Sequence, residues 1–115
     1  MLFRSYEAGA PAEAVKALES AVRLKPRYAE AHNSLGVLHF EAGRHAAAEA
    51  AFELAVRLRP DFAPARYNLA AANLARNKRD AAYAQYQALK NLDGRLAVKL
   101  YGGLMRGMVL SLSNK

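Results

Sequence analysis

Apolar residues return at steps of three and four along most of the chain, and short polar segments interrupt them at regular intervals. Ala14, Leu18, Ala21 and Val22 are an example, since this spacing places side chains on one face of an α-helix. Much of the apolar half of the chain is alanine, which suits packed helices better than strands. The pattern predicts an all-α protein. The expected helices cover residues 1–8, 11–25, 28–42, 45–58, 62–76, 79–92 and 95–110.

The segment 29–62 matches the chain again at a shift of 34 residues in either direction. The matched positions are Leu35 with Leu69, Gly36 with Ala70, Ala48 with Ala82 and Phe52 with Tyr86 forward, and Ala48 with Ala14, Phe52 with Leu18 and Pro60 with Pro26 backward. Because the paired side chains have similar sizes, the chain is predicted to be a helical repeat with two helices in each unit.

Glycine and asparagine mark the turns inside these units. Gly9 and Gly43 each follow the pair Glu-Ala, and Asn77 stands at the same place one unit later, where it tolerates left-handed backbone. Gly36 is different, because it lies within a predicted helix, where glycine costs about 1 kcal/mol relative to alanine. We expect it to let the second helix of its unit approach closely, and Ala70 to do the same in the next unit.

The chain resembles the tetratricopeptide repeat family at Leu35, Gly36, Ala48, Phe52 and Pro60. It departs from the family pattern at His32 and His39, which replace a tryptophan and a tyrosine. The resemblance implies antiparallel helix pairs stacked into a right-handed superhelix of about two and a half to three repeats, in which the first helix of each pair lines a concave groove. The predicted domain covers residues 1–110, with a partial repeat 1–28, repeats 29–62 and 63–94, a capping helix 95–110 and a tail 111–115.

The repeat register then names a partner-binding groove. Its predicted residues are Phe3, Tyr6, Asn33, Val37, Phe40, Tyr67, Asn68, Ala71, Leu74, Tyr101, Met105 and Met108. Aromatic side chains, methionines and two amides are suited to a peptide, because the amides can bond to its main chain. For Ala71 and Leu74, an ordinary place in the core is an equal alternative. Some family members bind chaperone tails through a basic set in this groove, but only Asn68 fits that set here, so this use is disfavoured.

The net charge of +7 lies entirely in the second half of the chain. Residues 1–62 carry eight Lys or Arg and eight Asp or Glu, whereas residues 63–115 carry nine basic residues against Asp80 and Asp93. Such asymmetry can steer acidic partners or nucleic acid toward the molecule, but solvated outer helix faces that are rich in arginine are the favoured interpretation. Nucleic-acid binding is the weakest hypothesis, because repeats that read RNA need a longer array. The basic residues considered for it are Arg66, Arg76, Lys78, Arg79, Arg95 and Lys99.

Chemistry-bearing motifs are missing from the sequence. There is no cysteine, no G-x-S-x-G nucleophile motif and no phosphate loop after a strand. His32 and His39 are two helical turns apart and His45 lies across a turn, so these histidines are not expected to bind zinc. We therefore predict a non-catalytic protein without cofactor or metal.

The leading hypothesis is a scaffold that binds a peptide or helix of another protein. The alternative is self-assembly as a homodimer, or a fragment whose missing repeats cover apolar ends. The residues expected in such exposed ends are Leu2 and Phe3, and Leu100, Leu104, Met105, Met108, Val109 and Leu112. We expect no signal peptide and no membrane span, which favours the cytoplasm. The bias toward alanine and arginine suggests a bacterial source.

Overall fold

The computed structural model of the chain describes the backbone of residues 2–113 and the side chains of residues 12–106. This part of the chain holds six α-helices and no strand, so the predicted all-α class is confirmed. The helices are α1 (Leu2–Leu24), α2 (Ala29–Glu41), α3 (His45–Leu58), α4 (Ala63–Ala75), α5 (Arg79–Leu92) and α6 (Gly94–Ser113).

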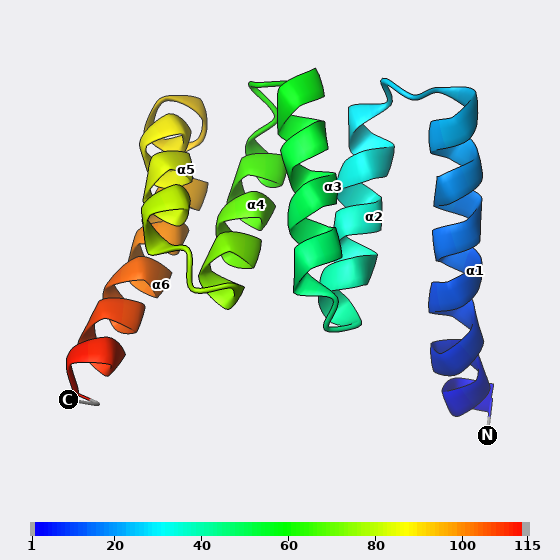
Figure 1. The fold of residues 1–115 in the computed structure, drawn as a ribbon, viewed down its shortest axis with the longest axis horizontal. Helices are drawn as coiled ribbons and strands as arrows, with labels where there is room; N and C mark the ends of the chain where they lie inside the picture. The colour runs from blue at the N-terminus through cyan, green and yellow to red at the C-terminus, as the bar shows by residue number, and fades with distance from the viewer. Residues whose placement is uncertain (1, 114–115) are drawn as a thin grey trace.

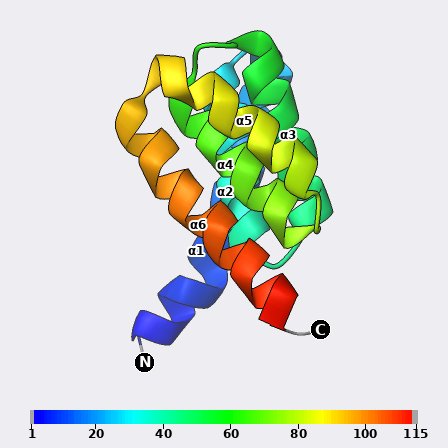
Figure 2. The same cartoon turned by 90° about the vertical axis from the view of Figure 1, so that its left-hand side faces the viewer.

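The helices stand in a row, with each one packed on its neighbours in the chain (Figure 1). α2 with α3 and α4 with α5 form antiparallel hairpins, and α6 contacts both α5 and α4. At that end of the row α5 and α6 run antiparallel (Figure 2). The molecule measures 42 × 35 × 22 Å. Its core is therefore divided into apolar clusters between successive helices rather than gathered at one centre.

The turns inside the two hairpins have the same hydrogen bonds. In the first, Gly43 N donates to Phe40 O at 3.0 Å. One unit later Asn77 N donates to Leu74 O, also at 3.0 Å. Both turn residues have positive φ, +82° for Gly43 and +63° for Asn77. The left-handed backbone expected at Asn77 is confirmed, since asparagine tolerates this region better than most residues.

Gly36 allows α3 to lie directly against α2. A Cβ at this position would overlap the Phe52 ring, whose Cζ atom would lie only 2.9 Å away. Phe52 itself is 1 % exposed. The close approach expected at Gly36 is confirmed, and it explains why the cost of a glycine within a helix is accepted here.

The predicted turn at Gly9 is wrong, because α1 is one helix from Leu2 to Leu24. Within the described part of the chain α1 contacts only α2, and its side chains from residue 12 to residue 24 are all at least partly exposed. A separate two-turn helix would need packing to be stable. A continuous helix instead satisfies most of its backbone N–H and C=O groups internally.

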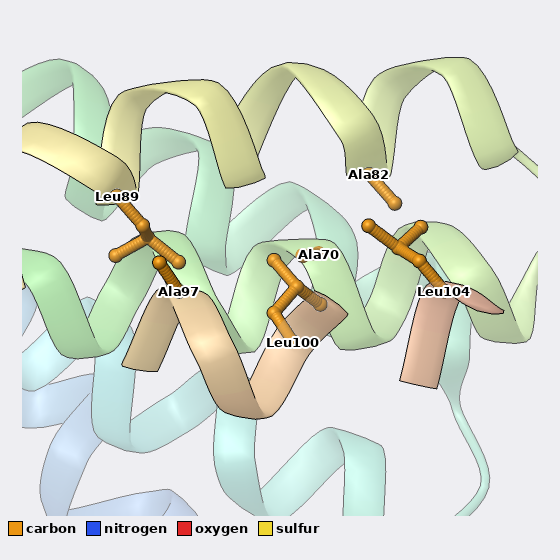
Figure 3. Close-up of a cluster of buried hydrophobic side chains, with 6 residues drawn as sticks. All are labelled: Ala70, Ala82, Leu89, Ala97, Leu100 and Leu104. Carbon is orange, nitrogen blue, oxygen red and sulfur yellow. The ribbon is translucent and has the colours of Figure 1, made fainter. Parts of the chain in front are cut away.

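α6 also differs from the prediction. It extends to Ser113 instead of ending at 110, and Leu100 and Leu104 are buried rather than exposed. They join a cluster with Ala70, Ala82 and Leu89 (Figure 3).

When α4 and α6 are aligned at the 34-residue shift, their buried positions agree only in part. α4 buries Leu69 in the cluster that it forms with α3, but the matching residue of α6 is Gly103, which has no side chain to bury. Leu104, the next residue, is buried, as is its counterpart Ala70. The connection also differs, because Asp93 alone joins α5 to α6 and its Oδ1 accepts from the backbone N–H of Leu96 at 3.2 Å. The capping helix therefore keeps the buried position of Ala70, at Leu104, but has no counterpart of the Leu69 side chain.

Candidate partner-binding groove

A hollow of about 240 Å³ lies between α2 and α4, with α3 beneath it. We name it the α2–α4 hollow, and its lining residues are Val37, Phe40, Glu41, Phe52, Tyr67, Asn68 and Ala71. Phe52 is buried and belongs to the floor, whereas Val37, Phe40 and Tyr67 are half-buried and offer apolar surface. Five of the predicted groove residues line this one hollow, which is the most that the structure brings together.

A pair of amides joins the two helices beside the hollow. Asn68 Nδ2 donates to Asn33 Oδ1 at 3.0 Å, and both side chains are half-buried. This bond orients Asn33 Nδ2 and Asn68 Oδ1, which are a donor and an acceptor that take no part in it. One donor and one acceptor are what a peptide group needs, since it offers a C=O and an N–H.

A cation from α6 lies over the ring of Tyr67. The Lys99 ammonium stands 5.3 Å from the centre of the Tyr67 ring, within the range of a cation–π interaction. Tyr67 therefore has two roles, because it lines the α2–α4 hollow and also packs against the cluster that α4, α5 and α6 share. The contact holds a positive charge near the hollow, opposite in sign to Glu41 in the lining.

The remaining predicted groove residues lie elsewhere. Leu74 packs against the cluster of α4, α5 and α6, as the core alternative for it allowed. Tyr101 and Met105 are exposed by 46 % and 39 % but line a different cavity. Phe3, Tyr6 and Met108 lie outside the residues whose side chains the structure describes, as do Leu2, Val109 and Leu112.

This second cavity, of about 530 Å³, lies where the first turns of α5 meet the later part of α6. We name it the α5–α6 pocket, and its lining residues are Arg79, Asp80, Tyr83, Tyr101, Leu104 and Met105. The rings of Tyr83 and Tyr101 both contact the Tyr86 ring in a tilted arrangement, with their centres 5.7 and 5.5 Å from its centre. Tyr83 was not predicted as a binding residue, because it lies on the second helix of its pair and the predicted groove residues lie on first helices.

The buried carboxylate of Glu49 was also missed. It accepts hydrogen bonds from Asn73 Nδ2 at 2.6 Å, from Arg76 at 2.6 Å and from Lys78 at 2.9 Å. Burial raises the pKa of this carboxyl group, but the bonds from Lys78, Asn73 and Arg76 outweigh burial and hold the pKa below its ordinary value. All these partners belong to the chain itself, so Glu49 ties α3 to the turn between α4 and α5 and is not a ligand site.

The three histidines have separate surroundings. His32 Nε2 lies 3.0 Å from Pro26 O, His39 Nδ1 accepts from Arg44 at 3.2 Å, and His45 packs edge-on against Phe40. Among the described side chains, no group of three His, Asp or Glu is placed to hold a metal ion. No helix in the same region is both long and apolar enough to span a bilayer.

Comparison with known families gives a match to the tetratricopeptide repeat over residues 5–61. Comparison with curated protein sequences gives no match.

Several solved structures share the fold. The first TPR of Spaghetti (RPAP3), bound to HSP90 peptide SRMEEVD, has a TM-score of 0.81 at 19 % identity over 92 % of this chain and 86 % of that one. TTC0263, a thermophilic TPR protein in Thermus thermophilus, has a TM-score of 0.76 at 32 % identity over 89 % of this chain and 54 % of its own. The type III secretion translocator chaperone SycD of Yersinia enterocolitica has a TM-score of 0.76 at 14 % identity over 95 % and 79 %. The chain thus spans about half the length of TTC0263.

Proposed function

Since the chain belongs to the tetratricopeptide repeat family, we propose that it binds a peptide segment of a partner protein in the α2–α4 hollow. Tetratricopeptide repeat proteins are generally non-catalytic protein-interaction scaffolds, and we propose a non-catalytic role for this chain. One observation carries the proposed binding: an apolar hollow with an oriented pair of amides beside it.

The two parts of the site have different tasks. The surfaces of Val37, Phe40 and Tyr67 can cover an apolar side chain of the peptide, which supplies most of the affinity because apolar area leaves water. Asn33 and Asn68 can then bond to the peptide main chain next to that side chain. Because the amides already hold each other in place, little further ordering is needed on binding.

The chemistry of the hollow also narrows the ligand. Spaghetti is bound to an HSP90 peptide with several acidic residues. In this chain the described lining of the hollow carries Glu41 and no lysine or arginine, since Lys99 contacts the Tyr67 ring but does not line the hollow. We therefore expect a peptide whose contact residues are apolar rather than a carboxylate-rich tail.

The test uses isotope-labelled protein and peptides selected from a displayed random library. We expect the amide signals of Val37, Phe40 and Asn68 to shift on titration. Ala71→Glu, which places a charge in the hollow, should weaken binding about tenfold or more. Ala75→Glu is the matched control, because Ala75 is exposed on the same helix. Shifts that avoid these residues, or equal effects of the two variants, would show that the peptide binds elsewhere.

A further inference from the structure

Each hairpin packs against the helix that follows it, and we call this contact a joint. The two joints contain different side chains. At the joint of α3 with α4, Glu49 is buried and bonded to Asn73, and to Lys78 from the turn that follows α4. At the joint of α5 with α6, the residue 34 positions after Glu49 is Tyr83, which is 50 % exposed. The space beside Tyr83 is the α5–α6 pocket.

The walls of this pocket are apolar and partly aromatic. Leu104 forms the base and is 5 % exposed, whereas Tyr83, Tyr101 and Met105 are each exposed by more than a third. The tyrosines are held by their contacts with Tyr86, so the walls exist before any ligand arrives. A pre-formed apolar concavity of about 530 Å³ is within the size range of pockets that bind small ligands or side chains of a peptide.

Charge around the pocket is positive. Arg79 lies in its lining, Arg76 and Lys78 precede it in the turn, and the Arg106 guanidinium lies close to Gly102 on α6. Among the described side chains around the pocket, the carboxylates are those of Asp80 in the lining and of Glu49, which bonds to Arg76 and Lys78, so the basic residues outnumber the acidic ones. A ligand with negative charge beside its apolar part therefore matches this end of the molecule.

We propose that the α5–α6 pocket is a second docking site, separate from the α2–α4 hollow, for an acidic protein segment that inserts an aromatic or aliphatic side chain. The inserted side chain packs between Tyr83, Tyr101 and Met105, and flanking Asp or Glu residues of the segment lie near Arg79 and Arg106. Aromatic pairs add about 0.5–1.5 kcal/mol to simple burial.

A protein segment fits better than single-stranded RNA, although RNA also favours basic and aromatic surfaces. The tyrosines contact Tyr86 and enclose a cavity with Leu104 and Met105 rather than forming a flat stacking platform. Asp80 lies in the lining, and its negative charge repels the phosphate groups, which RNA carries at every nucleotide. A peptide can place its acidic residues away from Asp80.

The test selects peptides from a displayed random library against the whole chain and measures their affinities by fluorescence anisotropy. We expect one group of selected peptides to combine acidic residues with Phe, Tyr, Leu or Met. Met105→Glu should weaken this group about tenfold or more, since it charges the wall and repels the ligand. Val98→Glu is the matched control on the same helix, because Val98 is 74 % exposed and outside the pocket lining, and it should change affinity little.

Three further variants distinguish loss of binding from loss of folding, and the α5–α6 pocket from the α2–α4 hollow. Tyr83→Phe keeps the ring and should retain binding, whereas Tyr83→Glu should lose it, with both variants matching the wild type in thermal unfolding. Ala71→Glu, in the α2–α4 hollow, should leave this group of peptides unaffected, so failure of one site does not decide the other.

Four results overturn the proposal. The first is that no set of acidic peptides is selected, and the second is that Met105→Glu and Val98→Glu have equal effects. The third is that an unstructured RNA oligomer binds and Met105→Glu abolishes this binding. The fourth is that the chain self-associates and Met105→Glu abolishes the self-association. Light scattering at high protein concentration measures the last.

Discussion

The hairpins α2–α3 and α4–α5 have the same turn and the same 34-residue register, but they pack differently. In the first, Phe52 is buried against Gly36, and the small Ala55 follows one turn later. In the second, Ala70 replaces the glycine, and Tyr86, the counterpart of Phe52, is only half-buried.

The second hairpin recovers its core volume at another position. Leu89 stands where the first hairpin has Ala55, and it is fully buried in the cluster shared with α6. Tyr86 is half-buried at the edge of that cluster, where the rings of Tyr83 and Tyr101 contact it. The same backbone arrangement thus has two different packings. The first hairpin buries its aromatic ring, whereas the second leaves a row of tyrosines partly exposed beside a pocket.

The largest effect should come from removing the two aromatic rings in turn. Phe52→Ala should lower the free energy of unfolding by about 3–5 kcal/mol, because it leaves a cavity under α2. Tyr86→Ala should cost about 2 kcal/mol, since part of its ring is already in water. Urea unfolding followed by circular dichroism measures both, and equal costs would mean that the hairpins are packed alike.

The second prediction tests the joint that Glu49 closes. Glu49→Gln should lower the free energy of unfolding by about 2 kcal/mol, because Arg76 and Lys78 lose the charge of their shared acceptor. Glu53→Gln is the control, since Glu53 is exposed on the same helix and should matter little. A loss of equal size in both variants would assign the effect to the helix rather than to the joint.

The same carboxylate makes stability depend on pH. The pKa of Glu49 is lower in the folded chain than its ordinary value of 4.5. Its contribution is therefore complete above the pKa of the unfolded chain and is lost as pH falls through the lower folded value. Melting temperatures measured from neutral pH downward should fall more steeply below about pH 4.5 in the wild type than in Glu49→Gln. Parallel curves would contradict this role for Glu49.

The smallest effect concerns the position where the hairpins first diverge. Gly36→Ala gains about 1 kcal/mol of helix propensity, but its Cβ overlaps the Phe52 ring and costs about 1–3 kcal/mol, so we expect a net loss of about 1 kcal/mol. Adding Phe52→Leu should turn this loss into a gain relative to Phe52→Leu alone. A double-mutant cycle by thermal unfolding measures it, and additive effects would show that the ring does not limit residue 36.

Local signals predicted most of the fold. The four helices of the two hairpins were expected within about one or two residues of their observed ends, because apolar spacing and turn residues such as Gly43 and Asn77 act over short distances. The same reasoning failed at Gly9, where the glycine signal resembled that of Gly43 but α1 continues as one helix that, among the described helices, contacts only α2. A turn of this kind depends on tertiary packing as much as on its glycine.

The candidate site was predicted only in part. Val37, Phe40, Tyr67, Asn68 and Ala71 share a hollow, because they lie on α2 and α4, whose spacing the repeat register describes well. Tyr101 and Met105 were assigned by the same register, but the α5–α6 connection is shorter and these two residues line a different cavity. Tyr83 was not considered at all. Whether any of these residues binds a partner stays a prediction.

The sequence by itself therefore determined the repeat, the four helices of the two hairpins and the close contact at Gly36, since each of these follows from residue size and spacing along the chain. Only the tertiary structure decided which face of α6 is buried, how three side chains converge on Glu49, and where the pocket beside Tyr83 opens. These features depend on residues brought together from different helices. Their positions are set by connection length and by the volume available at each joint, neither of which a periodic pattern records.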